Sequence, residues 1–128
     1  MATILVVDDD KNLRALLDQE LTDEGFTIAT APDGNAALEY LEEHRPDIVV
    51  LDISMPGMDG LEVLSRISGR DKSLPVILHS AYSTYRDNIY SMPANAYVVK
   101  SGDLSELIEK IKALLLERSA LSVSGENI

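Results

Sequence analysis

The sequence predicts a doubly wound α/β protein, in which a five-stranded parallel sheet carries helices on both faces. Short apolar runs rich in β-branched residues alternate along the chain with longer segments whose apolar residues recur every three or four positions. The apolar runs show little polar alternation, which is typical of strands that are buried on both faces. Right-handed crossovers between such strands place the connecting helices on both sides of one sheet.

Five apolar runs are expected to be the strands of this sheet. One of them is weaker than the others and is expected nearer an edge of the sheet, at residues 27–31. The other four are closed by polar residues and occupy residues 4–7, 48–51, 76–78 and 97–99.

Helical spacing is clearest between residues 104 and 115, where leucine and isoleucine residues recur on one face. An earlier helix is expected to begin after the N-cap residue Asp10 and to end at Gly25. Two further helices are expected to begin after Asp33 and after Gly60.

The length and composition are those of one ordinary globular domain. A chain of 128 residues is close to the commonest domain size and can bury a single core. The expected domain covers residues 1–118. The stretch 119–128 loses the apolar stripe and is expected to be a frayed, flexible tail.

Charge and cysteine content exclude several classes of protein. A formal net charge of −11 would repel nucleic acid phosphates and anionic lipids, and no stretch concentrates Lys or Arg. The chain has no cysteine, so it forms neither disulfides nor thiolate metal sites. Its N-terminal apolar run is too short for a signal peptide or a membrane span. We therefore expect a cytoplasmic domain that does not itself bind nucleic acid or membranes.

Polar residues that can bind metal or phosphate stand at the ends of four expected strands. They are Asp8, Asp9 and Asp10 after the first strand, Asp52 after the third, Ser80 at the fourth and Lys100 at the fifth. If the strands have the flavodoxin-like order 2-1-3-4-5, these ends converge on one crevice. Clustered carboxylates repel one another unless a cation joins them, and hard oxygen ligands suit Mg²⁺, which also recruits phosphate oxygens. The sequence therefore predicts a Mg²⁺-assisted phosphoryl site.

Each of these residues also has an ordinary structural interpretation. The aspartates at 8–10 could only cap the following helix, Ser80 could satisfy a backbone group, and Lys100 could be a solvated side chain. Their joint occurrence at one sheet edge favours the functional interpretation. His79 lies in a buried strand run and is interpreted as a hydrogen-bonded core histidine.

Four motifs, in their order and spacing, make the chain similar to a known family. They are ILVVDDD at residues 4–10, LDISMPGMDG at 51–60, LHSA at 78–81 and YVVK at 97–100. With these motifs the chain resembles the receiver domain of bacterial two-component response regulators, from Thr3 to about Arg118. The resemblance implies a phosphorylation-activated signalling domain that catalyses its own phosphorylation and dephosphorylation but is not an enzyme acting on other substrates.

The resemblance also implies roles for individual residues. Asp9, Asp52 and the backbone carbonyl of Ser54 would bind Mg²⁺ directly, while Asp8 would act through water. Asp52 would take a phosphoryl group from a phosphohistidine of a sensor histidine kinase or histidine phosphotransfer protein. Lys100 would hold oxygen atoms of the phosphoryl group or of the carboxylate.

The expected response to phosphorylation involves two more side chains. Ser80 would hydrogen-bond the new phosphoryl group, and Tyr97 would change its rotamer. The surface around residues 84–92 and the fifth strand would then change for a downstream protein.

Two features depart from the family pattern. Ser101 stands where many receiver domains have proline after the lysine, which leaves the geometry of that loop open. The segment 84–92, before Pro93, contains β-branched, aromatic and Asn residues, so its helix should be short and weak.

Two alternatives come from other functional classes. One is a Mg²⁺-dependent phosphohydrolase that forms an aspartyl phosphate, although such enzymes need an acid-base carboxylate two residues after the nucleophile, where this chain has Ser54. The other is a receiver-like interaction module that is never phosphorylated. The full acidic set, together with Ser80 and Lys100, argues against this second alternative.

Overall fold

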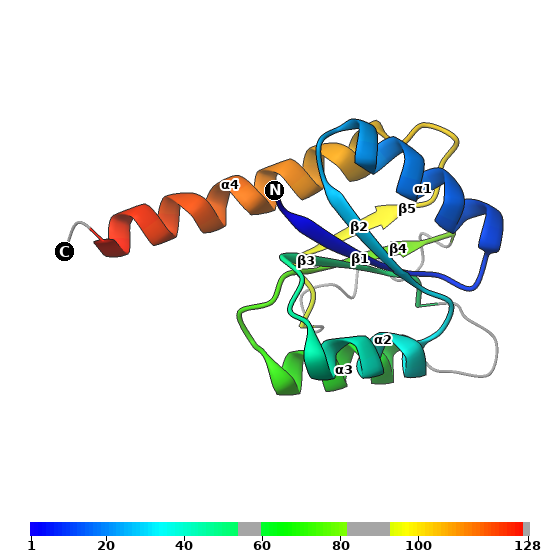
Figure 1. Cartoon of the computed structure of the whole chain (residues 1–128), viewed down its shortest axis with the longest axis horizontal. Coiled ribbons are helices and arrows are strands. Elements are labelled where there is room, and N and C mark those ends of the chain that lie inside the picture. The colour runs from blue at the N-terminus through cyan, green and yellow to red at the C-terminus, as the bar shows by residue number, and fades with distance from the viewer. Residues whose placement is uncertain (54–59, 82–92, 127–128) are drawn as a thin grey trace.

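The computed structural model describes residues 1–53, 60–81 and 93–126, with side chains through Glu117. Five parallel strands form one sheet in the order β2-β1-β3-β4-β5, which confirms the predicted fold (Figure 1). The strands are β1 (Thr3–Val7), β2 (Thr27–Ala31), β3 (Ile48–Leu51), β4 (Val76–Ser80) and β5 (Ala96–Val99). The described parts of the chain contain the helices α1 (Lys11–Asp23), α2 (Gly34–Glu43), α3 (Gly60–Arg70) and α4 (Ser105–Glu126).

The strands follow the sequence prediction closely. Strand β2 lies at an edge of the sheet, as its weaker pattern indicates. Strand β4 continues to Ser80 instead of ending at Leu78, because the ladder to β5 pairs His79 with Val98 and Ser80 with Val99. Backbone pairing therefore extends the strand past the point where its apolar pattern ends.

The helix ends are set by the residues that the sequence suggests. The side chain of Asp10 accepts hydrogen bonds from the backbone N–H groups of Asn12 and Leu13, at 2.9 and 3.2 Å. Gly25, just beyond the end of α1, has a φ of 97°, a left-handed conformation that favours glycine. Asp33 caps α2 through the N–H of Ala36 at 2.8 Å.

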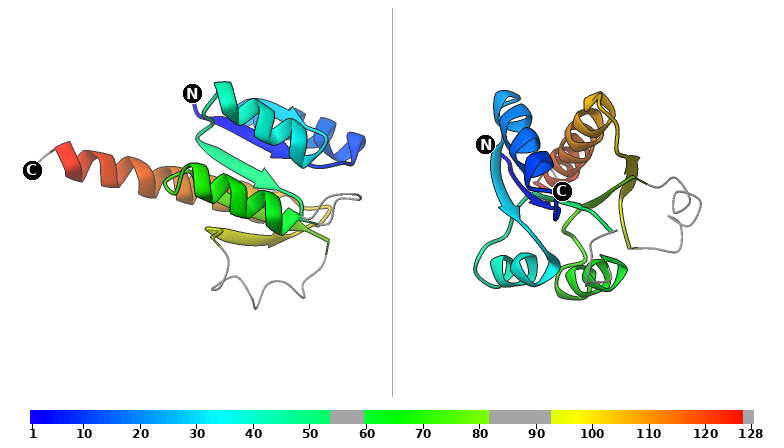
Figure 2. Two further views of the ribbon diagram at one scale, coloured as in Figure 1. Left: turned by 90° about the horizontal axis from the view of Figure 1, so that it is seen from below. Right: turned by 90° about the vertical axis from the view of Figure 1, so that its right-hand side faces the viewer.

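The core has two layers, one on each face of the sheet (Figure 2). Helices α1 and α4 cover one face, where Leu17 and Leu107 are fully or almost fully buried against the sheet. Helices α2 and α3 lie side by side on the other face and bury Ala37 and Val63. Successive strand residues alternate between these two layers, so the position of a residue in its strand decides which face its side chain enters.

Helix α4 runs past one end of the sheet (Figure 1). Its backbone is helical to Glu126, which differs from the frayed tail expected over residues 119–128, although the domain boundary at Arg118 stays a prediction. The expected helix at 84–92 lies outside the described residues. Within the described residues no helix is both long enough and apolar enough to cross a membrane.

Candidate functional site

Three carboxylates meet at the carboxyl ends of β1 and β3. Asp8 directly follows β1 and Asp52 directly follows β3, and the backbone N–H of Asp52 donates to Val7 across the two strands at 2.9 Å. One oxygen each from Asp8, Asp9 and Asp52 lies within 4.8 Å of the other two. The convergence that the strand order predicts is therefore present in the structure.

Lys100 forms ion pairs with two of these carboxylates. It follows β5, and its Nζ lies 2.9 Å from Asp8 Oδ2 and 3.0 Å from Asp52 Oδ2. Asp8 and Asp52 are both buried, whereas Asp9 is exposed. One ammonium group thus pairs with two of the three carboxylates, which leaves the site with an excess of negative charge.

The pKa values show how burial and pairing compete in this site. Burial raises the pKa of Asp8, even though the backbone N–H of Asp10 and the ammonium of Lys100 favour its charged form. Burial alone would lower the pKa of Lys100, but its hydrogen bonds to Asp8 and Asp52 raise that pKa above the ordinary value. Lys100 therefore stays charged, and Asp8 is a carboxylate that a further cation would stabilise.

Asp10 is separate from the carboxylate cluster. Its side chain caps α1, while its backbone N–H donates to Asp8 Oδ1 at 2.9 Å. The helix-capping role that the sequence also allowed for the acidic run thus belongs to Asp10, whereas Asp8 and Asp9 lie in the cluster.

The remaining predicted residues lie at the same end of the sheet or outside the described residues. Ser80 is fully buried at the end of β4, and its carbonyl accepts the backbone N–H of Lys100 at 2.7 Å. Tyr97 is buried in the layer that faces α2 and α3. Ser54 lies outside the described residues, so its carbonyl ligand role stays a prediction. The Lys100–Ser101 peptide bond is trans, as are the other described peptide bonds.

His79 lies next to the site, a position that the sequence interpretation did not give. It is buried as expected, and its Nδ1 has no hydrogen-bond partner among the described residues. The strand register places it one step beyond the pair Leu51–Leu78, beside Asp52 and on the same face of the sheet. Burial, with a smaller effect of Lys100, lowers the pKa of His79 to about 4, although Asp52 acts in the opposite direction.

This lowered pKa predicts a loss of stability in mild acid. Between the ordinary pKa of 6.5 and about 4, the unfolded chain binds a proton at His79 more readily than the folded chain does. The contribution of His79 is therefore complete above pH 6.5 and is lost as the pH falls, by about 2 kcal/mol at pH 5. Urea unfolding at pH 7 and pH 5 should show this loss in the wild type and a much smaller one in His79→Leu.

His44 supplies the control for this measurement, because it is exposed. His44→Leu should keep the pH dependence of the wild type. An equal loss of stability at pH 5 in the wild type and in His79→Leu would show that other groups carry the acid sensitivity.

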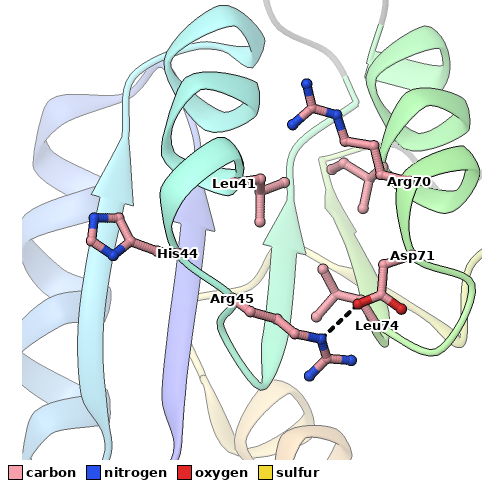
Figure 3. Close-up of a pocket in the computed structure, with 7 residues that line it drawn as sticks. Leu41, His44, Arg45, Arg70, Asp71 and Leu74 are labelled. Carbon is pink, nitrogen blue, oxygen red and sulfur yellow. Dashed lines mark hydrogen bonds and ion pairs between the residues drawn. The ribbon is translucent and has the colours of Figure 1, made fainter.

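A separate cavity of about 170 Å³ lies between α2 and α3, at the edge opposite the carboxylates (Figure 3). Leu41, Ile67 and Leu74 give it apolar walls. Arg45 crosses its rim to Asp71 at 2.6 Å and also donates to Ser73 at 3.0 Å. The polar groups at the rim therefore pair with one another. None of the residues that line the cavity belongs to the carboxylate cluster.

The acidic cluster fits a hard divalent cation. Its ligand atoms are carboxylate oxygens, which Mg²⁺ prefers, and the exposed side of the cluster leaves room for the waters that Mg²⁺ keeps. The fold and the site together define an α/β domain with an acidic cluster, suited to Mg²⁺, at the carboxyl edge of a parallel sheet. The chain belongs to the response regulator receiver domain family, whose model matches residues 4–112.

Individual relatives agree with this assignment. The transcriptional regulatory protein PrrA of Mycobacterium tuberculosis is 42% identical over 124 residues, which are 95% of this chain and 53% of PrrA. The chain thus spans about half the length of the curated relatives it matches. The response regulator protein TrrA from Thermotoga maritima, solved by crystallography in complex with Mg²⁺ and BeF, shares 48% sequence identity with this chain, and the two structures superpose with a TM-score of 0.84. That match covers 89% of this chain and 99% of TrrA.

A second structure contains TrrA in complex with the histidine kinase ThkA. There the identity is 49% and the TM-score is 0.83, with 90% of this chain and 99% of TrrA covered. The family match, the similar solved structures and the carboxylate cluster therefore all identify the chain as a receiver domain.

Proposed function

We propose that this chain is a phosphorylation-activated switch of a two-component system, with Asp52 as the phosphoryl acceptor. The observation that carries the proposal is the buried Asp52 carboxylate, held by Lys100 and clustered with Asp8 and Asp9 at one sheet edge. The TrrA complexes with Mg²⁺ and BeF and with a histidine kinase support the same chemistry for this chain.

The phosphoryl transfer can be written with the residues of this chain. An oxygen of Asp52 attacks the phosphorus of a phosphohistidine, the P–N bond breaks, and its electron pair returns to the imidazole of the donor. The product is an acyl phosphate on Asp52. The donor would be a sensor histidine kinase or a histidine phosphotransfer protein.

Lys100 has two tasks in this step. In the resting site it holds Asp52 in place from a distance of 3.0 Å. Because hydrogen bonds to carboxylates keep it charged, it can also bind an oxygen of the incoming phosphoryl group. The same lysine therefore orients the nucleophile and stabilises the charge that develops during transfer.

The metal would be held by Asp9 and Asp52, with the Ser54 carbonyl, while Asp8 would act through water. Bound Mg²⁺ supplies positive charge that offsets the phosphoryl oxygens. Attack of water on the phosphorus of the acyl phosphate, with the Asp52 carboxylate as the leaving group, would release inorganic phosphate, so the domain would catalyse its own dephosphorylation as well. Receiver function would reside in residues 1–118.

Signalling would follow from the new charge on Asp52. Ser80 lies at the end of β4 and its backbone is bonded to Lys100, so it can transmit a change at Asp52 to the segment that follows β4. Tyr97 and the surface beyond it would then present a different face to a downstream protein. We further propose a cytoplasmic location and no direct nucleic acid contact by this domain, whose net charge is −11.

The metal requirement can be tested with a small donor that contains a P–N bond. Incubation with Mg²⁺ and phosphoramidate should add one phosphoryl group, detected by intact-mass measurement, and EDTA should prevent it. Asp9→Ala should reduce the rate of addition strongly because it removes a metal ligand. Asp10→Ala should leave phosphorylation intact and cost about 1 kcal/mol of stability through the lost helix cap.

Two outcomes would contradict this proposal. One is phosphorylation of the wild type that continues at full rate in EDTA. The other is an equal rate for Asp9→Ala and Asp10→Ala, which would place the metal elsewhere.

A further inference from the structure

We propose that Arg14 is a positioning residue of the metal site, because it donates a hydrogen bond to the backbone carbonyl of Asp8, in the peptide unit between two aspartates of the cluster. Its Nη1 donates to the carbonyl oxygen of Asp8 at 2.7 Å. That carbonyl belongs to the peptide unit that joins Asp8 to Asp9. The inference rests on the proposed function, since it concerns the same Mg²⁺ site.

The polar groups of Asp8 are fixed from several directions. Its backbone N–H donates to Ala31 on β2 at 3.1 Å, and its carboxylate accepts from Asp10 N–H and from Lys100. Arg14 supplies the bond to the carbonyl oxygen. Substitution of Arg14 leaves the other groups of Asp8 their partners, but the peptide plane that leads to Asp9 loses the side-chain donor to its carbonyl oxygen.

Asp9 depends most on this peptide plane. Its side chain is exposed, whereas Asp8 and Asp52 are both buried and both held by Lys100. The position of the backbone that carries Asp9 therefore decides which points its carboxylate can reach. Holding that backbone keeps Asp9 within reach of the other two carboxylates before a cation arrives, and so lowers the cost of binding.

Arginine suits this task for geometric reasons. Arg14 lies on α1 and is half-buried, and its guanidinium reaches back over six residues to the loop that precedes the helix. The planar guanidinium offers several donors in a fixed arrangement, whereas a lysine ammonium is a compact charge on a flexible stem. Helix α1 therefore makes two contacts with the loop before it: its first backbone N–H groups donate to the Asp10 side chain, and Arg14 donates to the Asp8 carbonyl.

The charge of Arg14 acts against its geometric effect, and this makes the inference testable. A cation near three carboxylates repels Mg²⁺, so its removal by itself should tighten metal binding. Loss of the bond to Asp8 should weaken metal binding. The direction of the change in affinity therefore shows whether charge or positioning is the main effect of Arg14.

The experiment is a calorimetric titration of the whole chain with Mg²⁺ alone. Arg14→Met should raise the Mg²⁺ dissociation constant by about ten-fold, a typical effect of removing a group that orients a metal ligand. Arg14→Lys should give a smaller increase, because an ammonium can still donate. Lys11→Met is the matched control, since Lys11 is an exposed cation on the same helix, and it should leave the constant unchanged or slightly lower.

Urea unfolding of each variant shows that the titrated protein is folded. An Arg14→Met variant that binds Mg²⁺ as tightly as the wild type, or more tightly, would overturn the inference while leaving the proposed function intact. A wild-type chain that fails to bind Mg²⁺ would overturn the proposed function as well. If Arg14→Met does not fold, an Arg14→Lys affinity equal to that of the wild type would also count against positioning by the guanidinium.

Discussion

Asp52→Asn is expected to abolish phosphorylation by a small phosphodonor in the presence of Mg²⁺. The amide keeps the size of the side chain and can still meet Lys100, but its oxygen is a far weaker nucleophile than a carboxylate. The substitution also removes one of the three clustered negative charges, so metal binding should weaken. Intact-mass measurement after incubation with acetyl phosphate should show one added group in the wild type and none in the variant.

The matched control is Asp10→Asn, on the neighbouring loop. Asparagine caps a helix about as well as aspartate, so the cap on α1 should survive and phosphorylation should proceed normally. In the absence of Mg²⁺, Asp52→Asn should be at least as stable as the wild type, because two carboxylates repel less than three. An Asp52→Asn variant that gains the same mass as the wild type would show that another residue accepts the phosphoryl group.

The sequence predicts the sheet and the acidic cluster for the same physical reason. Parallel strands buried on both faces appear as apolar runs, and the polar residues that end those runs must collect at one edge. Asp8 and Asp52 were therefore expected to lie together if the first and third strands are neighbours, and the strand order of the structure meets that condition. Lys100 follows from the same argument applied to β5.

Other features depend on details that a linear pattern does not contain. The bond from Arg14 to the Asp8 carbonyl requires the exact path of the loop after β1, and no periodicity encodes that path. The sequence places His79 in a buried strand run, but its position beside Asp52 depends on the register between β3 and β4, which the apolar pattern does not give. The helical backbone beyond Arg118 continues after the apolar stripe has ended, so hydrophobic spacing gives no sign of it.

Gly60→Ala is expected to cause a large loss of stability, although it adds only a methyl group. A Cβ at Gly60 would overlap the Cα of Ile53 and would lie 2.8 Å from its carbonyl carbon and oxygen. These are backbone atoms two residues beyond the end of β3, so they cannot move aside as a flexible side chain would. The start of α3 would have to shift away from the sheet, at a cost of about 3 kcal/mol of unfolding free energy.

Gly69→Ala is the control, because Gly69 lies in the same helix with nothing within 4 Å of an added Cβ. Alanine favours helix over glycine, so this variant should be more stable than the wild type by up to about 1 kcal/mol. Urea unfolding of both variants measures the two effects. Equal stability of Gly60→Ala and the wild type would mean that α3 does not approach Ile53 this closely in solution.

The same substitution should also reach the phosphoryl site, because Ile53 directly follows Asp52. A displacement of Ile53 moves the end of β3 and with it the Asp52 carboxylate, which is held within 4.8 Å of Asp8 and Asp9. Under conditions where Gly60→Ala is still folded, its Mg²⁺-dependent phosphorylation should be slower than that of the wild type, while Gly69→Ala should match the wild type. A folded Gly60→Ala variant with an unchanged rate of phosphorylation would show that the contact between Gly60 and Ile53 stabilises the fold without positioning Asp52.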